Sequence, residues 1–167
     1  MNNSIASVPF PKNEPIRNYE PNSEEKKSVL KTYKKLKESN IDVPMWINGK
    51  SVKSSKTRNM SPPHNHKHSL GKYYLAEKKH VELAIKSALN AKEKWSNMPW
   101  EERAAIFIKA AELIAGPYRD KINAATMLAQ SKTIFQAEID AACELIDFLK
   151  FNVHSMQHIY SQQPKSD

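Results

Sequence analysis

The chain has 167 residues, enough for one domain, and carries a net charge of +8 with three glycines and one cysteine. A dinucleotide-binding turn or a phosphate-binding loop needs closely spaced glycines, and Gly49, Gly71 and Gly116 are isolated, so these residues alone build no nucleotide-binding fold. The positive charge lies before residue 100, much of it on one lysine-rich segment, without a zinc-finger, helix-turn-helix or aromatic-interleaved basic pattern, which argues against nucleic-acid binding.

The chain is predicted to begin with an arm and a short helix. Residues 1–22 contain four prolines and little periodicity, which predicts an extended N-terminal arm. Asn22 and Ser23 then offer a helix cap, and apolar residues follow at helical spacing. This pattern predicts an amphipathic helix over 23–39.

Residues 44–76 have the pattern of a small β element with a loop. The run 45–47 is β-prone, Asn48-Gly49 is a strong hairpin signal, and 51–53 supplies a return strand. A further strand is predicted over 70–76. Because so few strands cannot stand alone as a sheet, we expect other strands or a partner surface to complete them.

Residues 78–160 are predicted to be helical. The first helix ends near Pro99, the second at Gly116-Pro117, a third follows, and the last spans about 133–160. Apolar residues at helical spacing are expected to face a core: Val81, Ala84, Ile85, Ala88, Leu89 and Trp95, then Ala104, Phe107, Ala111 and Ile114, then Phe135, Ile139, Ala142, Ile146, Leu149, Val153 and Met156. The fold class is therefore α+β, mostly helical, with a small β-hairpin and strand element.

Three histidines alternate in one segment, His64, His66 and His68. Alternating histidines on a strand could bind zinc from one face. Pro62-Pro63 instead indicates a loop, and no acidic residue or cysteine lies nearby to complete a ligand set. We therefore predict a polar surface loop and no metal site.

The last helix carries a cysteine and four carboxylates. Cys143 lies among alanines and beside Glu144, which disfavours a thiolate, so a packed side chain is predicted rather than a nucleophile. Glu138, Asp140, Glu144 and Asp147 cluster on this helix, and Asp140, Glu144 and Asp147 share one face by their spacing. Paired carboxylates could serve acid–base chemistry or bind a cation, but spacing alone favours a solvated acidic face.

Cysteine content and hydropathy predict a cytoplasmic protein. A single cysteine forms no internal disulfide, which suits a reducing compartment. The first residues lack the apolar region of a secretory signal, and no run approaches the ~18 apolar residues of a membrane span.

Several stretches then resemble one family. Asn13-Glu14-Pro15 precedes the lysine-rich helix, and the most specific part runs from Asn97 to Asn152, with the core KTIFQAEIDAACELIDFLKFN. These stretches resemble the start of L-glutamate γ-semialdehyde dehydrogenases, also called 1-pyrroline-5-carboxylate dehydrogenases, of the aldehyde dehydrogenase superfamily. The resemblance covers about residues 13–164.

The resemblance implies that residues 23–167 are an incomplete N-terminal part of the aldehyde dehydrogenase NAD-binding domain, with the Rossmann core absent. Family members oxidise an aldehyde with NAD through a cysteine thiolate and a water-activating glutamate. In this branch the substrate is the semialdehyde of proline degradation. The nucleophile, the base and the NAD site all lie downstream of this region, so the chain alone is expected to be inactive and its end at Asp167 suggests a fragment.

One family residue can be carried over. Glu144, in AACELIDF, matches a glutamate that lines the substrate pocket, where its carboxylate would face the α-ammonium group of the semialdehyde. The complete enzyme would be a homo-oligomer acting on this small molecule, with no nucleic-acid or membrane partner. The alternative is a non-enzymatic helical oligomerisation or interaction module, since the segment would expose apolar surface.

Overall fold

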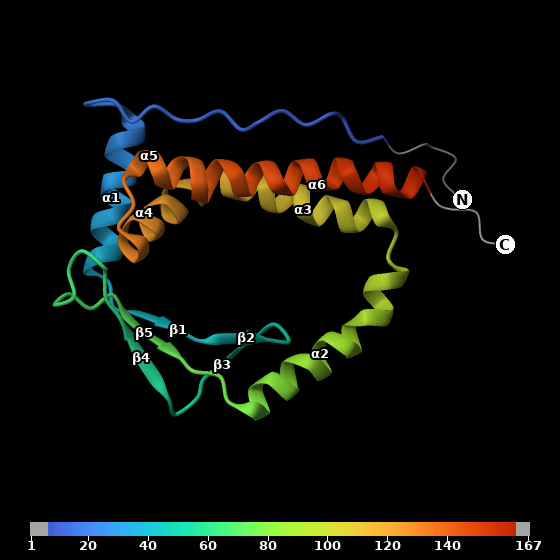
Figure 1. Ribbon diagram of the computed structural model, residues 1–167, viewed down its shortest axis with the longest axis horizontal. Helices are drawn as coiled ribbons and strands as arrows, with labels where there is room; N and C mark the ends of the chain where they lie inside the picture. Colours follow the sequence, from blue (N-terminus) through green and yellow to red (C-terminus); the bar gives the residue numbers. More distant parts are fainter. Residues whose placement is uncertain (1–6, 163–167) are drawn as a thin grey trace.

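The computed structural model describes residues 7–162, which form two layers joined at both ends (Figure 1). A helical layer lies opposite a small β layer, helix α1 joins the layers on one side, and helix α2 joins them on the other. The helices of residues 7–162 are α1 (Glu24–Glu38), α2 (Lys78–Asn97), α3 (Trp100–Ala115), α4 (Arg119–Gln130), α5 (Ile134–Ala137) and α6 (Glu144–Ser161), with a π-helical turn η1 (Glu138–Cys143) between the last two.

The β layer contains the predicted hairpin and a three-stranded sheet. The strands are β1 (Ile41–Val43), β2 (Met45–Ile47), β3 (Lys50–Val52), β4 (Thr57–Met60) and β5 (Gly71–Tyr74). Strands β2 and β3 pair antiparallel, and Asn48 and Gly49 between them have φ of 53° and 69°, as a two-residue hairpin turn requires. In the other sheet β5 lies in the middle, parallel to β1 and antiparallel to β4. The hairpin prediction is confirmed.

Two strands were not expected from the sequence. Strand β1 lies before the predicted β segment, and β4 lies within it. Both are only three or four residues long, and most of their side chains are exposed. Strand β4, Thr-Arg-Asn-Met, shows no alternation of apolar and polar residues, and Ile-Asp-Val of β1 is too short to show a pattern, so their pairing with β5 defines both strands.

Small side chains bring the helices together. Helix α3 packs against α6, and α1 packs against α4. The arm, residues 7–20, contains neither helix nor strand and runs along α6 (Figure 1). The buried apolar residues of the helices include Val29, Ala104, Ala111, Ala124, Leu128, Ala137, Ala142, Ile146 and Val153.

The expected core-facing stripe of α2 is exposed. Val81, Ile85, Leu89 and Trp95 are 51%, 55%, 63% and 41% exposed. Phe107 in α3 and Phe135 in α5 are also exposed, against expectation, at 42% and 63%. The spacing identified the apolar faces correctly, but no element within residues 7–162 covers them.

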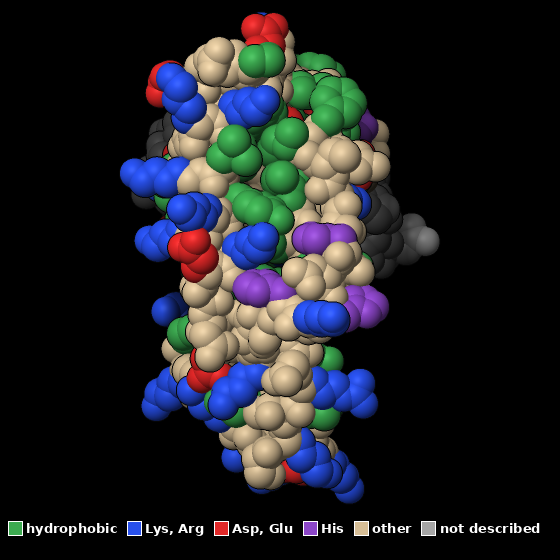
Figure 2. Space-filling model, turned by 90° about the vertical axis from the view of Figure 1, so that its left-hand side faces the viewer, with side chains coloured by type: hydrophobic (Ala, Val, Ile, Leu, Met, Phe, Trp, Pro, Cys, Tyr) green, Lys and Arg blue, Asp and Glu red, His purple; other side chains and the backbone are tan. Residues whose placement is uncertain are grey.

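The lysine-rich surface is solvated, as its sequence indicated. Figure 2 views the molecule from the side on which α1 lies, and lysine and arginine side chains project around this face with hydrophobic side chains between them. Lys27, Lys34 and Lys35 on α1 are all exposed. Within the described residues, no helix is both long and apolar enough to cross a membrane.

Gly71 is required where the parallel strands meet. Its φ is +129°, and a Cβ atom there would lie 1.9 Å from the Ile41 backbone oxygen. We expect Gly71→Ala to lower the free energy of unfolding by about 3 kcal/mol, because both the backbone and the β1–β5 contact would be strained. Gly49→Ala is the matched control: its φ is also positive, at +69°, but nothing lies within 4 Å of the added Cβ, so about 1 kcal/mol is expected. Urea unfolding of both variants measures the difference, and equal losses would contradict the close-approach explanation.

Candidate functional site

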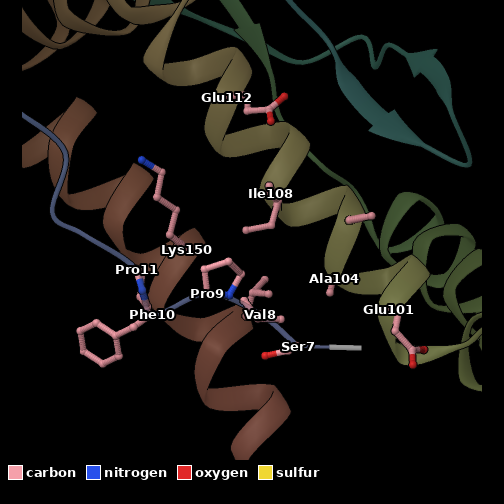
Figure 3. Close-up of a pocket in the computed structure, with 12 residues that line it drawn as sticks. Ser7, Val8, Pro9, Phe10, Pro11, Glu101, Ala104, Ile108, Glu112 and Lys150 are labelled. Carbon is pink, nitrogen blue, oxygen red and sulfur yellow. The ribbon is translucent and has the colours of Figure 1, made fainter. Parts of the chain in front are cut away.

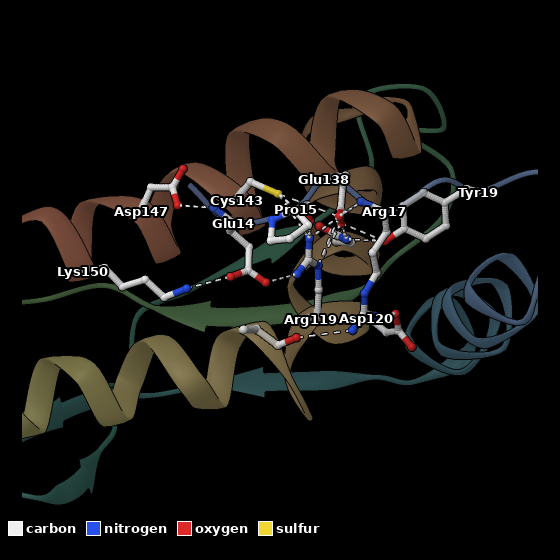
Figure 4. A network of polar contacts seen from close by, with 12 residues as sticks. Glu14, Pro15, Arg17, Tyr19, Arg119, Asp120, Glu138, Cys143, Asp147 and Lys150 are labelled. Atoms are coloured by element: carbon white, nitrogen blue, oxygen red, sulfur yellow. Dashed lines mark hydrogen bonds and ion pairs between the residues drawn. The ribbon is translucent and has the colours of Figure 1, made fainter. Parts of the chain in front are cut away.

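A buried ion pair lies at the centre of the helical layer (Figure 4). Arg119, at the start of α4, and Glu138, at the start of η1, are 2% and 0% exposed. The Arg119 Nε donates to Glu138 Oε1 at 3.2 Å, and its Nη2 bonds the same carboxylate. Such a pair is stable only when further hydrogen bonds satisfy its remaining atoms.

The N-terminal arm supplies several of those bonds. The backbone N–H of Arg17 donates to Glu138 Oε1 at 2.8 Å, and the Tyr19 hydroxyl donates to Oε2 at 2.8 Å. The Asn123 amide on α4 also donates to Oε2, at 2.7 Å. Glu138 therefore accepts from α4 and from the arm at once, which fixes the arm to the helical layer.

Glu14 is the second carboxylate of the network. Its Oε1 lies 2.6 Å from Arg119 Nη1, and its Oε2 lies 2.8 Å from Lys150 Nζ on α6. Arg119 Nη2 also donates to the Pro15 carbonyl at 2.7 Å. The sequence Asn13-Glu14-Pro15 thus places its acidic side chain between α4 and α6.

The network determines the protonation of its members. Burial alone would raise the pKa of Glu138, but hydrogen bonds from Arg119, the Arg17 backbone and others outweigh it and lower this pKa to about 2. Burial and the hydrogen bond to Glu138 raise the pKa of Tyr19, which stays a neutral donor. The carboxylate is therefore charged across the physiological range.

The sequence did not indicate that Arg119, Asn123 and the arm residues form a cluster. One signal was present: Glu138 precedes Ala142 by four residues and Ile146 by eight, and all three are buried. A carboxylate in a buried helical stripe requires a cationic partner. The sequence could not indicate which lysine or arginine supplies it.

The turn η1 changes the face on which the carboxylates lie. A π-helical turn contains an extra residue, so side chains beyond it are rotated relative to a regular α-helix. Asp140 pairs with Lys132 at 2.7 Å, Glu138 is buried, and Asp147 is partly covered by the arm. The prediction of one solvated acidic face is therefore wrong, because only Asp140 and Glu144 are exposed.

Cys143 is a packed side chain, as predicted. It is 4% exposed, and Arg119 Nη2 lies 3.2 Å from its Sγ. Burial, followed by the charge of Glu138, raises the pKa of the thiol to about 11. The thiol is therefore protonated at neutral pH and is a poor nucleophile.

Glu144 and Asp147 line one hollow of about 550 Å³ beside the arm. Its other walls are Asn13, Phe148, Phe151 and Asn152. Asn13 Nδ2 donates to Asp147 Oδ2 at 2.8 Å, and the Glu14 N–H donates to Oδ1 at 2.7 Å. Aromatic walls with a carboxylate suit a small cationic ligand.

A second hollow, of about 480 Å³, lies where the arm crosses between α3 and α6 (Figure 3). Residues 7–11 form one wall, and Ala104 and Ile108 of α3 form another. The ring of Phe10 contacts Phe151 and His154 edge-on. This hollow is mostly apolar, and the arm forms one of its walls.

The histidines do not converge. His64 bonds the Ser131 hydroxyl at 2.7 Å, whereas His68 bonds the Lys37 carbonyl at 2.7 Å. Among residues 7–162, no group of three histidine, cysteine or acidic side chains is arranged to hold a metal ion.

The described residues do not fit a dinucleotide. The connection from β5 to α2, residues 75–77, contains no glycine. At the N-terminus of α2, Glu77 caps the helix, so a carboxylate occupies the place where a pyrophosphate would bind. Gly71 is the nearest glycine, and its role is the contact with β1.

The low pKa of Glu138 predicts an acid-sensitive fold. Because the pKa is lower in the folded than in the unfolded chain, the stabilisation is complete above about pH 4.5 and is lost as the pH falls towards 2. A shift from 4.5 to about 2 corresponds to about 3 kcal/mol. We expect urea unfolding between pH 5 and about pH 2 to show this loss, and Glu138→Gln to be less stable at neutral pH and less sensitive to acid. The control Asp140→Asn changes an exposed pair and should keep the wild-type profile; an unchanged profile in Glu138→Gln would contradict the assignment.

Comparison with known proteins matches this arrangement to one family. Residues 46–167 match the model of the aldehyde dehydrogenase family. A probable delta-1-pyrroline-5-carboxylate dehydrogenase of Schizosaccharomyces pombe is 44% identical over 158 residues, which are 94% of this chain and 29% of that protein. The mitochondrial delta-1-pyrroline-5-carboxylate dehydrogenase of Dictyostelium discoideum is 38% identical over 162 residues, 97% of this chain and 29% of that protein.

A solved structure matches the same family. The delta-pyrroline-5-carboxylate dehydrogenase of Mycobacterium tuberculosis, bound with NAD and cobalamin, superposes with a TM-score of 0.95 at 42% identity, covering 100% of this chain and 32% of that one. The chain thus spans slightly less than a third of the length of the relatives it matches. The match over residues 46–167 and the superposition of the whole arrangement show that the chain belongs to the aldehyde dehydrogenase family.

Proposed function

We propose that this chain is the N-terminal part of an NAD-dependent L-glutamate γ-semialdehyde dehydrogenase, which oxidises the semialdehyde formed from 1-pyrroline-5-carboxylate to L-glutamate in proline degradation. The observation that carries the proposal is similarity over almost the whole chain, 94% and 97% of it, to relatives that bear this activity in their names. The alternative, a non-enzymatic interaction module, has no comparable support.

The contribution of this chain to the reaction is structural and substrate-binding. When bound, NAD supplies the hydride acceptor. Cys143 is buried with a raised pKa, so it does not attack an aldehyde, and the described residues build no cofactor site. What they offer is Glu144, an exposed carboxylate in a hollow with aromatic walls. Its charge suits the α-ammonium group of the semialdehyde.

The location and the oligomeric state of the protein are also proposals. The buried thiol of Cys143 suits a reducing compartment, and we assign a cytoplasmic location, although the Dictyostelium discoideum and Bos taurus relatives are named mitochondrial. Subcellular fractionation with immunodetection separates the two. The exposed apolar faces of α2 and α3 suit assembly of the complete enzyme as a homo-oligomer, which sedimentation of that enzyme would test.

The activity proposal is tested with two proteins. The purified chain 1–167 should form no NADH from the semialdehyde and NAD, because the thiol of Cys143 is buried and protonated and residues 7–162 form no cofactor site. A hybrid in which the chain replaces the matching part of the Mycobacterium tuberculosis enzyme should form NADH. NADH formation by the chain alone would contradict the prediction that it is inactive. A folded, NAD-binding hybrid that oxidises plain aldehydes but not the semialdehyde would contradict the proposed substrate.

The role of Glu144 is tested in the same hybrid. Glu144→Gln should raise KM for the semialdehyde by about 10- to 100-fold, the scale of a charge-assisted hydrogen bond, and should leave the kinetics with butanal unchanged, since butanal has no ammonium group. Asp140→Asn is the control, because Asp140 is exposed and pairs with Lys132 outside the hollow. If Glu144→Gln affects both aldehydes equally, Glu144 does not bind the ammonium group.

A further inference from the structure

The hollow that holds Glu144 contains a second carboxylate, Asp147. The two residues are one helical turn apart on α6, about 4.5 Å along its axis. Two free carboxylates so close would offer two alternative positions to one ammonium group. The structure treats them differently: Glu144 is exposed, whereas both oxygens of Asp147 accept hydrogen bonds from the arm.

The bonds to Asp147 come from consecutive residues. The Asn13 side-chain amide donates to one oxygen at 2.8 Å, and the Glu14 backbone N–H donates to the other at 2.7 Å. A carboxylate that accepts on both oxygens has fewer free acceptor sites for a ligand. Asn13 and Asp147 both line the hollow, so the donor occupies one oxygen of the carboxylate at the wall that a ligand would meet.

The arm is held in this position independently of Asp147. The side chain of Glu14 bonds Arg119 and Lys150, and the next residues of the arm bond Glu138 (Figure 4). The donors that cover Asp147 are therefore preorganised by the buried ion pair. The free energy of the buried network, rather than contact with ligand, keeps Asp147 covered.

From this geometry we infer that the N-terminal arm is a specificity element of the substrate site: Asn13 and the Glu14 N–H cover Asp147, so the hollow presents one free carboxylate, Glu144, and holds a single ammonium group in one position. Asn13 and Asp147 are positioning residues. The inference rests on the proposed role of Glu144. The ligands it favours are aldehydes with one ammonium group.

The test uses the hybrid enzyme described above. Asn13→Ala frees one oxygen of Asp147, and the ammonium group can then bind one turn away from its productive position. Non-productive binding lowers kcat and KM together, so we expect both to fall, each by about tenfold, for the semialdehyde, with butanal kinetics unchanged. The double variant Asn13→Ala/Asp147→Asn removes the competing charge and should restore kcat. Asn18→Ala, a change at an exposed arm residue whose side-chain amide donates to Glu20, is the control and should behave as wild type.

The outcomes separate the two proposals. Loss of activity towards both aldehydes in Asn13→Ala, without rescue by Asp147→Asn, would show that the arm is only structural and would overturn the inference. An unchanged Asn13→Ala enzyme would overturn it as well. If Glu144→Gln changes the kinetics with both aldehydes equally, the proposed role of Glu144 is wrong. If Glu144→Gln affects only the semialdehyde but Asn13→Ala changes the kinetics with both aldehydes equally, only the covering of Asp147 is wrong.

Discussion

The buried pair of Arg119 and Glu138 is the interaction on which the helical layer depends. Removing two charges from water is costly, and the cost is offset here because two neighbouring elements supply hydrogen bonds: α4 through Asn123, and the arm through Arg17 and Tyr19. Replacing one partner would leave an unpaired buried charge, which is strongly destabilising. The arm is consequently part of the fold, although it contains no helix or strand.

The same interaction connects the fold to the candidate substrate site. Glu138 begins the π-helical turn, and Glu144 begins α6 directly after it. Glu14 joins the pair to Lys150, while its backbone N–H holds Asp147. A buried ion pair, an irregular helical turn and an arm far away in sequence therefore determine together which carboxylate is free. π-Helical turns are frequent at functional sites.

The apolar faces of α2 and α3 are uncovered in the part of the chain that the structure describes, in contrast to the buried polar network. Their residues are spaced as for a buried helix, yet Leu89 is 63% exposed and Phe107 is 42% exposed. These relatives are more than three times as long as this chain, so a protein of their length has further residues that can cover these faces. The buried charges of Arg119 and Glu138 are paired within residues 7–162, whereas the apolar faces of α2 and α3 are uncovered there.

The sequence by itself determined the secondary structure of the helices, the Asn48-Gly49 hairpin and the family, because helical periodicity, turn residues and a specific motif are local signals. It also determined that Cys143 is packed. Only the tertiary structure decided the partner of Glu138, the strands β1 and β4, and the different roles of Glu144 and Asp147. Each of these depends on pairs of residues from 11 to 134 positions apart, or on a π-helical turn that alters the helical phase, and spacing along one segment carries no information about either.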